Sequence, residues 1–488
     1  MSGKRRSGGY AGDRVAVGED QTGSGAEESK RGFIRAMGLF PATALNMSQM
    51  VGIGPFITIP LILTVLTGPL AIAGWVVGAL IAMCDGLVWA ELGAAMPAAG
   101  GSYVYLREAF QYGTGRFMPF MFVWSTLLVT PLIMSTGMIG MTDYLGYFWH
   151  MSPWISHWVA VGFTVLTVGL LWRRIESVAA ITKLLWAGML VTVGLVIVGT
   201  YSHFDAHMAF HLPPGTLSFG SFAVGLGAGL VLSIYDYLGY YTVAYMGDEV
   251  KQPGRVIPKA IILSILGVMC IDLTMNIGIL GVMPIKAAKA SQFIGTDALN
   301  AVWGRPAAIA VTILVLWTAF ASVYTGLLGA SRLPFNAARD GMFFRPFGKL
   351  HKTLRFPHIS LLAMGAVTAI ACFFTLTTII NALIALVIWV QFIGQIVALT
   401  ILRKKQPELR RPYKQWLYPV PSIIALAGWI YIFQASGWSS IRIMLIWTAV
   451  GVVAFLVWAR IERTWPFGPK VIHEEFLEEQ QTSALPVA

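Results

Sequence analysis

Residues 40–66 read FPATALNMSQMVGIGPFITIPLILTVL, an apolar run that is interrupted at its centre by Gly52-Ile53-Gly54-Pro55. The run is long enough to cross a membrane as one helix. Its two glycines weaken a helix, and its proline removes a backbone donor. Because an unpaired backbone group is costly in hydrocarbon, such a break persists only where it lines a cavity or binds something. The stretch therefore predicts a broken membrane span of the kind that carries solute sites in secondary transporters.

The composition is that of a polytopic membrane protein. Of the 488 residues, 56% are hydrophobic and only 12% are charged, whereas a soluble domain carries about 25% charged residues. A membrane-spanning helix needs about 20 apolar residues. The candidate spans are 40–66, 69–97, 117–146, 156–172, 180–201, 217–246, 257–283, 307–330, 357–378, 380–402, 418–435 and 441–460. The predicted fold is therefore all-α, integral to the membrane and built on twelve transmembrane helices.

Lys and Arg residues predict the orientation, since they are enriched in cytoplasmic loops. They gather in the N-terminal tail, between Arg332 and Arg355, and between Arg403 and Lys414. The basic residues left for the opposite side are Lys286, Lys289, Arg305 and Arg442. Both termini are thus expected in the cytoplasm, and the protein in the plasma or inner membrane. The net charge of +11 then faces anionic lipid, and no nucleic-acid partner is expected.

The chain divides into three segments. Residues 1–32 are rich in glycine and mixed charge, a composition typical of a disordered tail, here cytoplasmic. Residues 33–464 form the predicted transmembrane domain, and residues 465–488 form a short, acidic cytoplasmic tail. No cleavable signal peptide is visible. The three cysteines lie in apolar runs, and their spacing indicates neither a disulfide nor a metal site.

A second interruption lies five spans after the first, in the run 217–246. The segment from Tyr235 to Gly239 places Asp236 in the middle of this span. A carboxylate there costs roughly 2.5–3.5 kcal/mol on insertion scales, so we expect it to face a cavity. Two interrupted spans at this separation predict two inverted five-span repeats, as in LeuT-type carriers, with two further peripheral spans.

Four motifs give the chain a resemblance to a known family. They are AELG at 90–93 with PAAGGSYVY at 97–105, EVKQP at 249–253 with IPKA at 257–260, AARDG at 337–341, and the basic run RKKQPELRRP at 403–412. Each motif is weak alone. In this order and topology they make the chain resemble the amino acid–polyamine–organocation (APC) permease superfamily, in its amino acid permease branch, over most of residues 36–420.

The resemblance implies a LeuT-like fold with ten core helices, two peripheral helices and alternating access around a site between spans one and six. Gly52, Ile53 and Gly54 match the family's G-x-G motif, whose N–H groups hold the substrate carboxylate. A half-helix N-terminus carries partial positive charge and free donors, which suits this role. The substrate ammonium would meet carbonyls near the other half-helix ends. The residues expected there are Met50, Tyr235 (at the family's aromatic gate), Asp236, Leu238 and Gly239.

The chain departs from the family pattern at the predicted site. Ile53 stands where relatives often carry serine, Pro55 follows the motif, and Asp236 stands where relatives often carry a small residue. A carboxylate beside the substrate ammonium favours a cationic amino acid or a polyamine. Alternatively, Asp236 is a structural cap or a proton acceptor that never touches substrate.

Lys183, at the start of the fifth span, aligns with a lysine that replaces sodium in some proton-coupled relatives. A lysine shifts its pKa readily when buried, so Lys183 is a candidate coupling residue. The alternative is a lysine that extends its ammonium to the interface from a helix end.

Charged residues of the motifs are candidates for an intracellular gate. Glu91, Glu249, Arg339 and Asp340 are all expected near the cytoplasmic side, where ion pairs could form and break. Glu91 is equally compatible with a structural cap, and the other three with solvated loop charges. Asp85 and Asp272 also lie in apolar runs, where either a paired structural role or a functional one is open.

The leading prediction is a secondary active transporter that moves amino acids across the plasma membrane, either coupled to protons or as an exchanger. One alternative is a carrier of polyamines or other organic cations with the same fold. Another is an amino acid sensor that does not transport, which the short tails disfavour. The scan finds no catalytic motif, no metal motif and no cofactor motif, so the chain is not expected to be an enzyme. The expected partners are a small-molecule substrate, protons and membrane lipids.

Overall fold

A computed structural model describes residues 35, 37–97, 100–172, 175–212, 219–354 and 356–467. Most of these residues lie in helices, and no named β-strand occurs among them. One isolated parallel bridge pairs Met37 with Val250. In this bridge the Met37 N–H donates to the carbonyl of Glu249 at 2.9 Å, and the Lys251 N–H donates to the carbonyl of Met37 at 2.8 Å. The predicted all-α fold class is confirmed.

The helices fall into three groups by length. The long helices are α4 (Ala71–Ala95), α6 (Phe117–Leu145), α7 (Pro153–Leu171), α8 (Ile175–Ser202), α11 (Pro253–Leu280), α14 (Arg305–Ala330) and α20 (Trp438–Ile461). Shorter apolar helices are α2 (Leu39–Met50), α3 (Gly54–Val65), α10 (Phe219–Tyr237), α16 (His358–Ala371), α17 (Leu376–Val387), α18 (Ile393–Lys405) and α19 (Val420–Ala435). Connecting helices are α5 (Ser102–Phe110), α9 (Ala206–Phe210), α12 (Ile285–Ala290), α13 (Ile294–Trp303) and α15 (Arg332–Arg339).

Among the described residues, seven helical segments are long and apolar enough to cross a membrane, and the bent pair α2 and α3 adds an eighth. Four further helices of 10–17 residues are also apolar. Each of the twelve predicted runs overlaps one of these segments, so the chain has the helical architecture of an APC-type membrane transporter. The count of twelve spans stays a prediction.

Two helix ends differ from the sequence-based boundaries. The run predicted as 357–378 ends its helix at Ala371, and the next helix already begins at Leu376. The cause is a local cap: the Thr375 hydroxyl accepts from the Thr378 N–H at 3.4 Å and starts a new helix. The apolar run predicted to continue to residue 246 ends its α-helix at Tyr237 and continues as short 3₁₀ turns.

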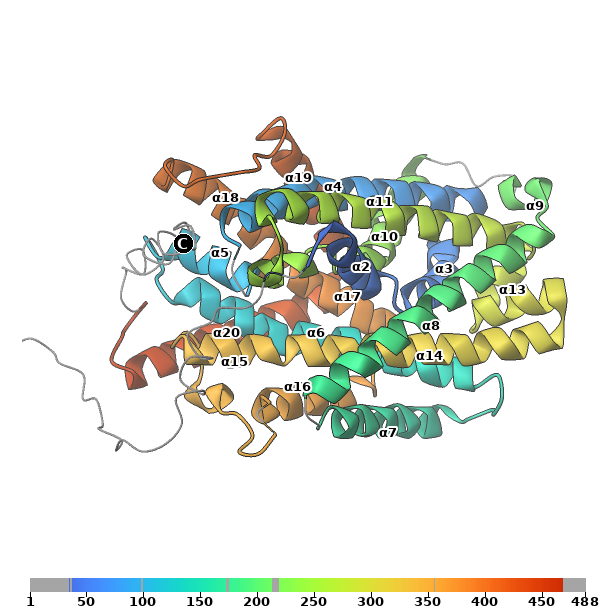
Figure 1. The fold of residues 1–488 in the computed structure, drawn as a ribbon. Coiled ribbons are helices and arrows are strands. Elements are labelled where there is room, and N and C mark those ends of the chain that lie inside the picture. Colours follow the sequence, from blue (N-terminus) through green and yellow to red (C-terminus); the bar gives the residue numbers. More distant parts are fainter. Residues whose placement is uncertain are drawn as a thin grey trace, which may run out of the picture.

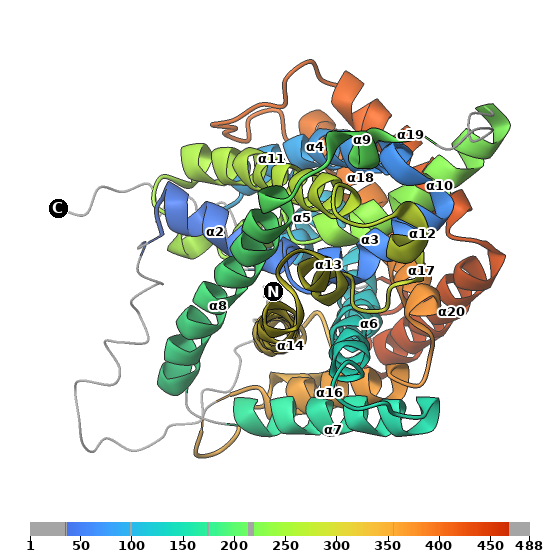
Figure 2. The same ribbon diagram turned by 90° about the vertical axis from the view of Figure 1, so that its right-hand side faces the viewer.

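The long helices run roughly along one direction (Figure 1). One end of this bundle carries α9 and α13, on the right of Figure 1, and the other carries α5 and α15. Figure 2, which views the bundle from the α13 end, places α3 in the interior, α2 toward one side, and α7 and α16 together along one edge. Helix α10 packs against α3 and α4, and α11 against α2 and α4. The two breaks are therefore in contact with other helices, and α3 is buried along most of its length.

Large apolar side chains cover the outside of the peripheral helices. On α20, Ile446 and Val453 are 65% and 61% exposed, and on α7 Val165 is 64% exposed. In water, such continuous apolar faces would be unfavourable. They fit a hydrocarbon environment, in which helices are apolar on their outer face.

Candidate functional site

The first predicted break is present, between α2 and α3. Helix α2 ends at Met50 and α3 begins at Gly54, and the two axes differ by 52°. Within the described residues, the N–H groups of Gly52, Ile53 and Gly54 donate no backbone hydrogen bond outside helix interiors. Three successive free donors at a helix N-terminus form an anion-binding arrangement. The predicted role of the G-x-G motif therefore has the local geometry that it requires.

Close packing explains why Gly52 is a glycine. A Cβ at Gly52 would lie 2.9 Å from the Cβ of Ser322 in α14. Real Cβ atoms rarely approach so closely, so a larger residue would push α14 away from the break. The break is thus held against α14 by backbone rather than by a side chain.

The second break lies beside the first. After Tyr237 the chain turns at Gly239, whose φ is +119° and whose Cβ would lie 2.9 Å from the Cβ of Gln49. Asn46 joins the two breaks: its Nδ2 donates to the Tyr240 carbonyl at 2.6 Å, and its Oδ1 accepts from the Val243 N–H at 2.8 Å. Asn46 thereby supplies partners for backbone groups that the end of α10 leaves free.

A cavity of about 320 Å³ runs along both breaks, within the size range of small-molecule sites. Its lining includes all the predicted substrate residues except Asp236. They are Met50, Gly52, Ile53, Gly54, Tyr235, Leu238 and Gly239. Gln391 also contributes; it lies in a π-helical turn, Ile388–Phe392, between α17 and α18. π-helical turns are frequent at functional sites.

Among the described residues, the cavity lining reaches the surface at the α15 end. Toward α15 it is lined by Gly329, which is exposed, and by the half-buried residues Arg332 and Asn336. Toward α13, Tyr144 closes it: its hydroxyl donates to the Phe56 carbonyl at 3.3 Å and accepts from the Gly295 N–H at 3.2 Å. Phe56 and Tyr144 are both fully buried, with their rings edge to face. The structure is therefore open toward the α15 end and closed toward the α13 end.

Asp236 points from α10 to α3. It is 1% exposed, and its Oδ2 lies 2.5 Å from the Thr58 hydroxyl. A Cβ at Gly54 would lie 2.0 Å from Asp236 Oδ1, so the carboxyl fills the space that a side chain at Gly54 would need. Substrate contact by Asp236 stays a prediction, and the cavity lining does not support it.

Tyr235 faces the cavity and is held by α6. Its hydroxyl lies 2.5 Å from the hydroxyl of Thr136. Thr136 also donates to the Ile133 carbonyl at 2.6 Å. Because a hydroxyl has one hydrogen, Tyr235 must be the donor to Thr136. The aromatic ring thus has a fixed direction, as a gate residue needs.

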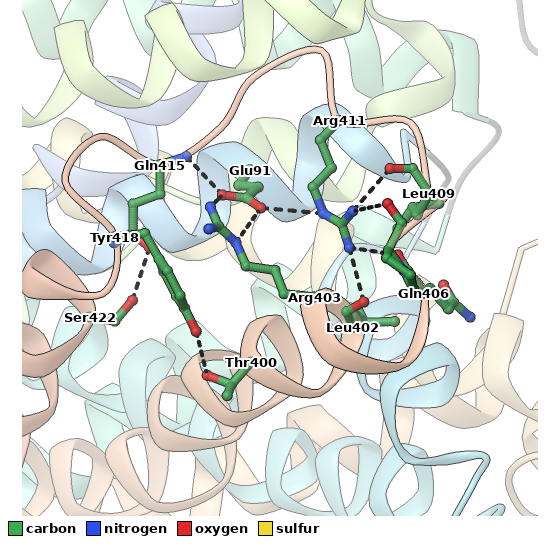
Figure 3. Close-up of polar contacts among 11 residues, drawn as sticks. Glu91, Thr400, Leu402, Arg403, Gln406, Leu409, Arg411, Gln415, Tyr418 and Ser422 are labelled. Carbon is green, nitrogen blue, oxygen red and sulfur yellow. Dashed lines mark hydrogen bonds and ion pairs between the residues drawn. The ribbon is translucent and has the colours of Figure 1, made fainter.

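Glu91 anchors the end of α4 to the segment between α18 and α19 (Figure 3). Its fully buried carboxylate accepts from Arg403 Nε at 2.9 Å, forms a second, short contact with the same guanidinium, and lies 3.4 Å from Arg411 Nε. The Gln415 N–H donates to it at 2.7 Å. Arg403 in turn lies 3.8 Å from the Tyr418 ring centroid. This closed network has the geometry of a structural anchor, and a gating role for Glu91 stays a prediction.

Arg411 completes this anchor through backbone carbonyls. Its guanidinium donates to the carbonyls of Leu402 at 2.9 Å, Gln406 at 3.0 Å and Leu409 at 3.0 Å (Figure 3). These bonds hold the C-terminal end of α18 to the following segment.

Among the described residues, the other predicted gating residues form no ion pair with one another. Glu249 lines the cavity near its open end, and Arg339 is exposed, with its guanidinium 5.7 Å from the Phe335 ring centroid. Asp340 instead meets α5: it accepts from the Tyr103 hydroxyl at 3.0 Å and lies 3.8 Å from Arg107. Their gating role stays a prediction.

Lys183 lies in α8, but its side chain is outside the described part of the structure.

Four contributors to the site were missed from the sequence: Asn46, Thr58, Thr136 and Arg107. Asn46 and Thr58 are isolated polar residues that flank the broken motif in an apolar run. Their position beside the motif could have identified them as candidates.

The sequence profile of the amino acid permease family matches residues 37–469. The chain is 24% identical to the branched-chain amino acid permease BcaP of Bacillus subtilis, over 89% of this chain and 95% of the relative. It is 22% identical to the serine/threonine exchanger SteT of the same organism, over 83% and 92%. It is 24% identical to the B. subtilis aspartate-proton symporter, over 90% and 86%. With the broken-helix site already described, this match shows that the chain is a transporter, not an enzyme, and belongs to the amino acid permease family.

Proposed function

We propose that this protein carries amino acids across the plasma membrane by alternating access, as a secondary active transporter with both termini in the cytoplasm. The observation that supports it most is the row of free N–H groups at Gly52, Ile53 and Gly54, beside a cavity of about 320 Å³. These donors and the positive end of the α3 dipole would bind the substrate carboxylate. The carbonyls at the C-terminal ends of α2 and α10 would bind its ammonium.

The substrate side chain would occupy an apolar part of the cavity. The lining residues from α6 and α14 include Val129, Ile133, Met134 and Val323. The charged side chains in the lining, Glu249 and Arg332, belong to the part toward α15. An apolar pocket beside the break favours a neutral amino acid with an aliphatic side chain. The relative named as a branched-chain amino acid permease is in keeping with this substrate class.

The polyamine alternative rested on Asp236 as a partner for a cationic group. Asp236 is directed to Thr58 and Gly54, outside the cavity lining. A polyamine also lacks the carboxylate for which the free N–H groups are suited. We therefore place the polyamine and sensor alternatives behind amino acid transport.

In the proposed cycle the structure corresponds to the inward-open state. The positive-inside rule assigns the α15 end, with Arg332 and Arg339 on its helix, to the cytoplasm. The bonds of Tyr144 to Phe56 and Gly295 would close the outer side. Outward opening requires these bonds to break while the cavity closes between α15 and the 3₁₀ turn that ends at Glu249.

Proteoliposomes containing the purified protein test this proposal. Uptake of labelled L-leucine should be inhibited by unlabelled leucine and isoleucine. Leucine methyl ester, which lacks the carboxylate, and isopentylamine, which lacks the carboxyl group altogether, should inhibit at least about tenfold more weakly. The matched comparison is putrescine. Saturable putrescine uptake without leucine uptake would overturn the proposal in favour of the polyamine carrier, and leucine binding without any uptake would favour the sensor.

A further inference from the structure

Two buried carboxylates, on helices α10 and α11 that both pack against α3 and α4, lack the partners that buried charges normally have. Asp236 of α10 is 1% exposed and Asp272 of α11 is fully buried. Among the described residues, Asp236 Oδ1 and both Asp272 oxygens have no hydrogen-bond partner. Asn276 follows Asp272 by one helical turn, on the same face of α11. It is also fully buried, and neither its Oδ1 nor its Nδ2 has a partner in the same part of the structure.

The two carboxyl groups interact with each other electrostatically. Two negative charges in the same part of a membrane interior would repel each other and would each lose their hydration. A positive species is therefore needed between them or on them. Asn276 adds one further oxygen and two N–H donors to the same polar cluster.

No described basic side chain is placed to supply this charge. Helices α2, α3, α10 and α17 contain no Lys or Arg. On α11 the basic residues are Arg255 and Lys259, and Lys259 lies about 20 Å along the helix from Asp272. Lys289 of α12 donates to the Thr67 hydroxyl at 3.0 Å.

The remaining titratable groups near the pair are weakly acidic or bonded elsewhere. Tyr237 interacts with both carboxyls and with Cys270, and its hydroxyl donates to the Trp75 carbonyl at 3.1 Å. On α4, Asp85 is bonded to Trp89 and Glu91 to the arginine network. Other titratable residues lie on packed helices. They are Cys84 of α4, Glu176, Lys183 and Tyr201 of α8, His207 of α9, Tyr235 of α10, Tyr245 of the 3₁₀ turn Thr242–Tyr245, Lys286 of α12, Asp297 of α13 and Tyr431 of α19.

The Thr58 hydroxyl indicates that the positive species is a proton. Its oxygen lies 3.0 Å from the Gly54 carbonyl and 2.5 Å from Asp236 Oδ2. A hydroxyl has one hydrogen, and a carbonyl can only accept. If Asp236 is protonated and donates to Thr58 while Thr58 donates to Gly54, each contact has its own hydrogen, and neither has to share one.

We propose that Asp236 and Asp272, with Asn276 beside them, form the proton-carrying site of this transporter. The inference rests on the proposed function, since it assigns the coupling step of that transport cycle. Asp236 is the protonated member in the proposed state. Loss of its proton leaves Thr58 with two acceptors for one hydrogen and leaves two charged carboxylates in the same part of the membrane interior.

The site is connected to the substrate position through α3. Thr58 lies one turn after Gly54, whose N–H group is one of the free donors at the break. The hydrogen bond between protonated Asp236 and Thr58 joins α10 to α3, and deprotonation of Asp236 breaks this bond. A shift of α3 against α10 moves the carboxylate-binding donors, so proton loading and substrate loading affect each other.

Leucine transport in proteoliposomes separates coupling from binding. Counterflow, in which labelled leucine exchanges for unlabelled leucine inside, needs no gradient, whereas net accumulation under an inward proton gradient needs coupling. Asp236→Asn can donate to Thr58 as the protonated acid does, so it should fold and keep counterflow within about twofold of the wild type. It should lose the stimulation of net uptake by the gradient, and Asp272→Asn should reduce that stimulation.

Two further variants serve as controls for the loss of proton-gradient stimulation. Asp205→Asn, an exposed N-cap that can still accept from the His207 N–H, should keep both activities. Lys183→Ala should keep the stimulation if the carboxyl pair carries the proton. Loss of stimulation in Lys183→Ala together with normal stimulation in both Asn variants would overturn the proposal. Accumulation driven by a sodium gradient, with no response to pH, would also overturn it.

Wild-type leucine counterflow distinguishes a failure of the proposed function from a failure of the coupling proposal. If the wild type shows no leucine counterflow, the substrate assignment is wrong, and the pair is tested without transport. A protonated buried carboxyl has its own infrared carbonyl band. That band should be present in the wild type and absent in Asp236→Asn, and its absence from the wild type would contradict the proton on Asp236. If Asp236→Asn does not fold, the comparison is made with Thr58→Val, which should shift the pH at which the band disappears.

Discussion

Asp85 and Asp236 are both carboxylates buried in the interior of the bundle, but their partners differ. Asp85 accepts from Trp89 Nε1 at 2.9 Å, from the Tyr240 hydroxyl at 2.5 Å and from Trp429 Nε1 at 3.1 Å. Asp236 has one hydroxyl neighbour and an unpartnered oxygen. Burial alone therefore does not identify a functional acid in this protein. The hydrogen-bond partners separate a carboxylate that joins helices from one that is available to bind a proton.

The largest expected effect is at Glu91, which is the most completely paired carboxylate. Glu91→Ala leaves the guanidiniums of Arg403, which is half-buried, and Arg411, whose side chain is 8% exposed, without their partner, and such a loss costs about 3–5 kcal/mol. The free energy of unfolding should fall by that amount, measured by thermal denaturation in detergent. Arg345→Ala is the control: its pair with Glu462 is on the surface, where Arg345 is 81% exposed, and such pairs contribute little. Equal losses in both variants would contradict the anchor role of Glu91.

The same substitution at two buried acids tests the comparison directly. Asp85→Asn turns an amide N–H toward indole or phenol donors, so at least one hydrogen bond is lost at a cost of about 1–3 kcal/mol. Asp272→Asn loses no observed hydrogen bond and removes a buried charge, so the stability should be unchanged or higher. Thermal unfolding of the two variants beside the wild type measures this. Greater destabilisation by Asp272→Asn would invalidate the distinction between paired and unpaired acids.

The contact between Gly54 and Asp236 predicts a local effect on binding. Gly54→Ala places a methyl group 2.0 Å from Asp236 Oδ1, so either the Asp236 carboxyl must leave its contact with Thr58 or α3 and α10 must separate. Leucine binding should weaken at least about tenfold, measured by ligand-induced thermal stabilisation. Gly113→Ala is the matched control, because a Cβ there has no neighbour within 4 Å. Adding Asp236→Ala to Gly54→Ala should recover part of the folding stability, and no recovery would show that another contact dominates.

The smallest effect is expected at the closed end of the cavity. Tyr144→Phe removes two neutral hydrogen bonds, to Phe56 and from Gly295, which together contribute about 1–3 kcal/mol. The closed α13 side should then open more often. Labelling of an engineered Ile53→Cys variant by a membrane-impermeant thiol reagent added outside, with and without Tyr144→Phe, measures the change. Slower labelling in the double variant would contradict the closing role of Tyr144.

The sequence predicted the breaks well because their causes are local. Two glycines and a proline disrupt a helix wherever they occur, so Gly52–Pro55 was correctly identified as a break. The direction of Asp236 could not be predicted in this way. Its side chain points to Thr58 because α10 packs on α3. The rotation of α10 about its own axis sets this direction, and it depends on contacts between distant parts of the chain.

Other omissions have the same physical origin. Glu91 was identified from its motif, but its partners come from a segment more than 300 residues later. The helix end at Ala371 was missed because the apolar run continues through Phe373 and Phe374, while the Thr375 hydroxyl starts a new helix. Composition predicts where apolar helices lie, and single polar groups decide where they end and what they face.

The packing of Gly54 against Asp236 has an evolutionary consequence. An acid at position 236 is compatible only with a residue that lacks a side chain at position 54, because both occupy the same space. Where a homologous chain carries a small residue at the position of Asp236, the constraint on the facing glycine is relaxed. The two positions are therefore expected to covary, and a change at position 236 during evolution would require a compatible residue at position 54.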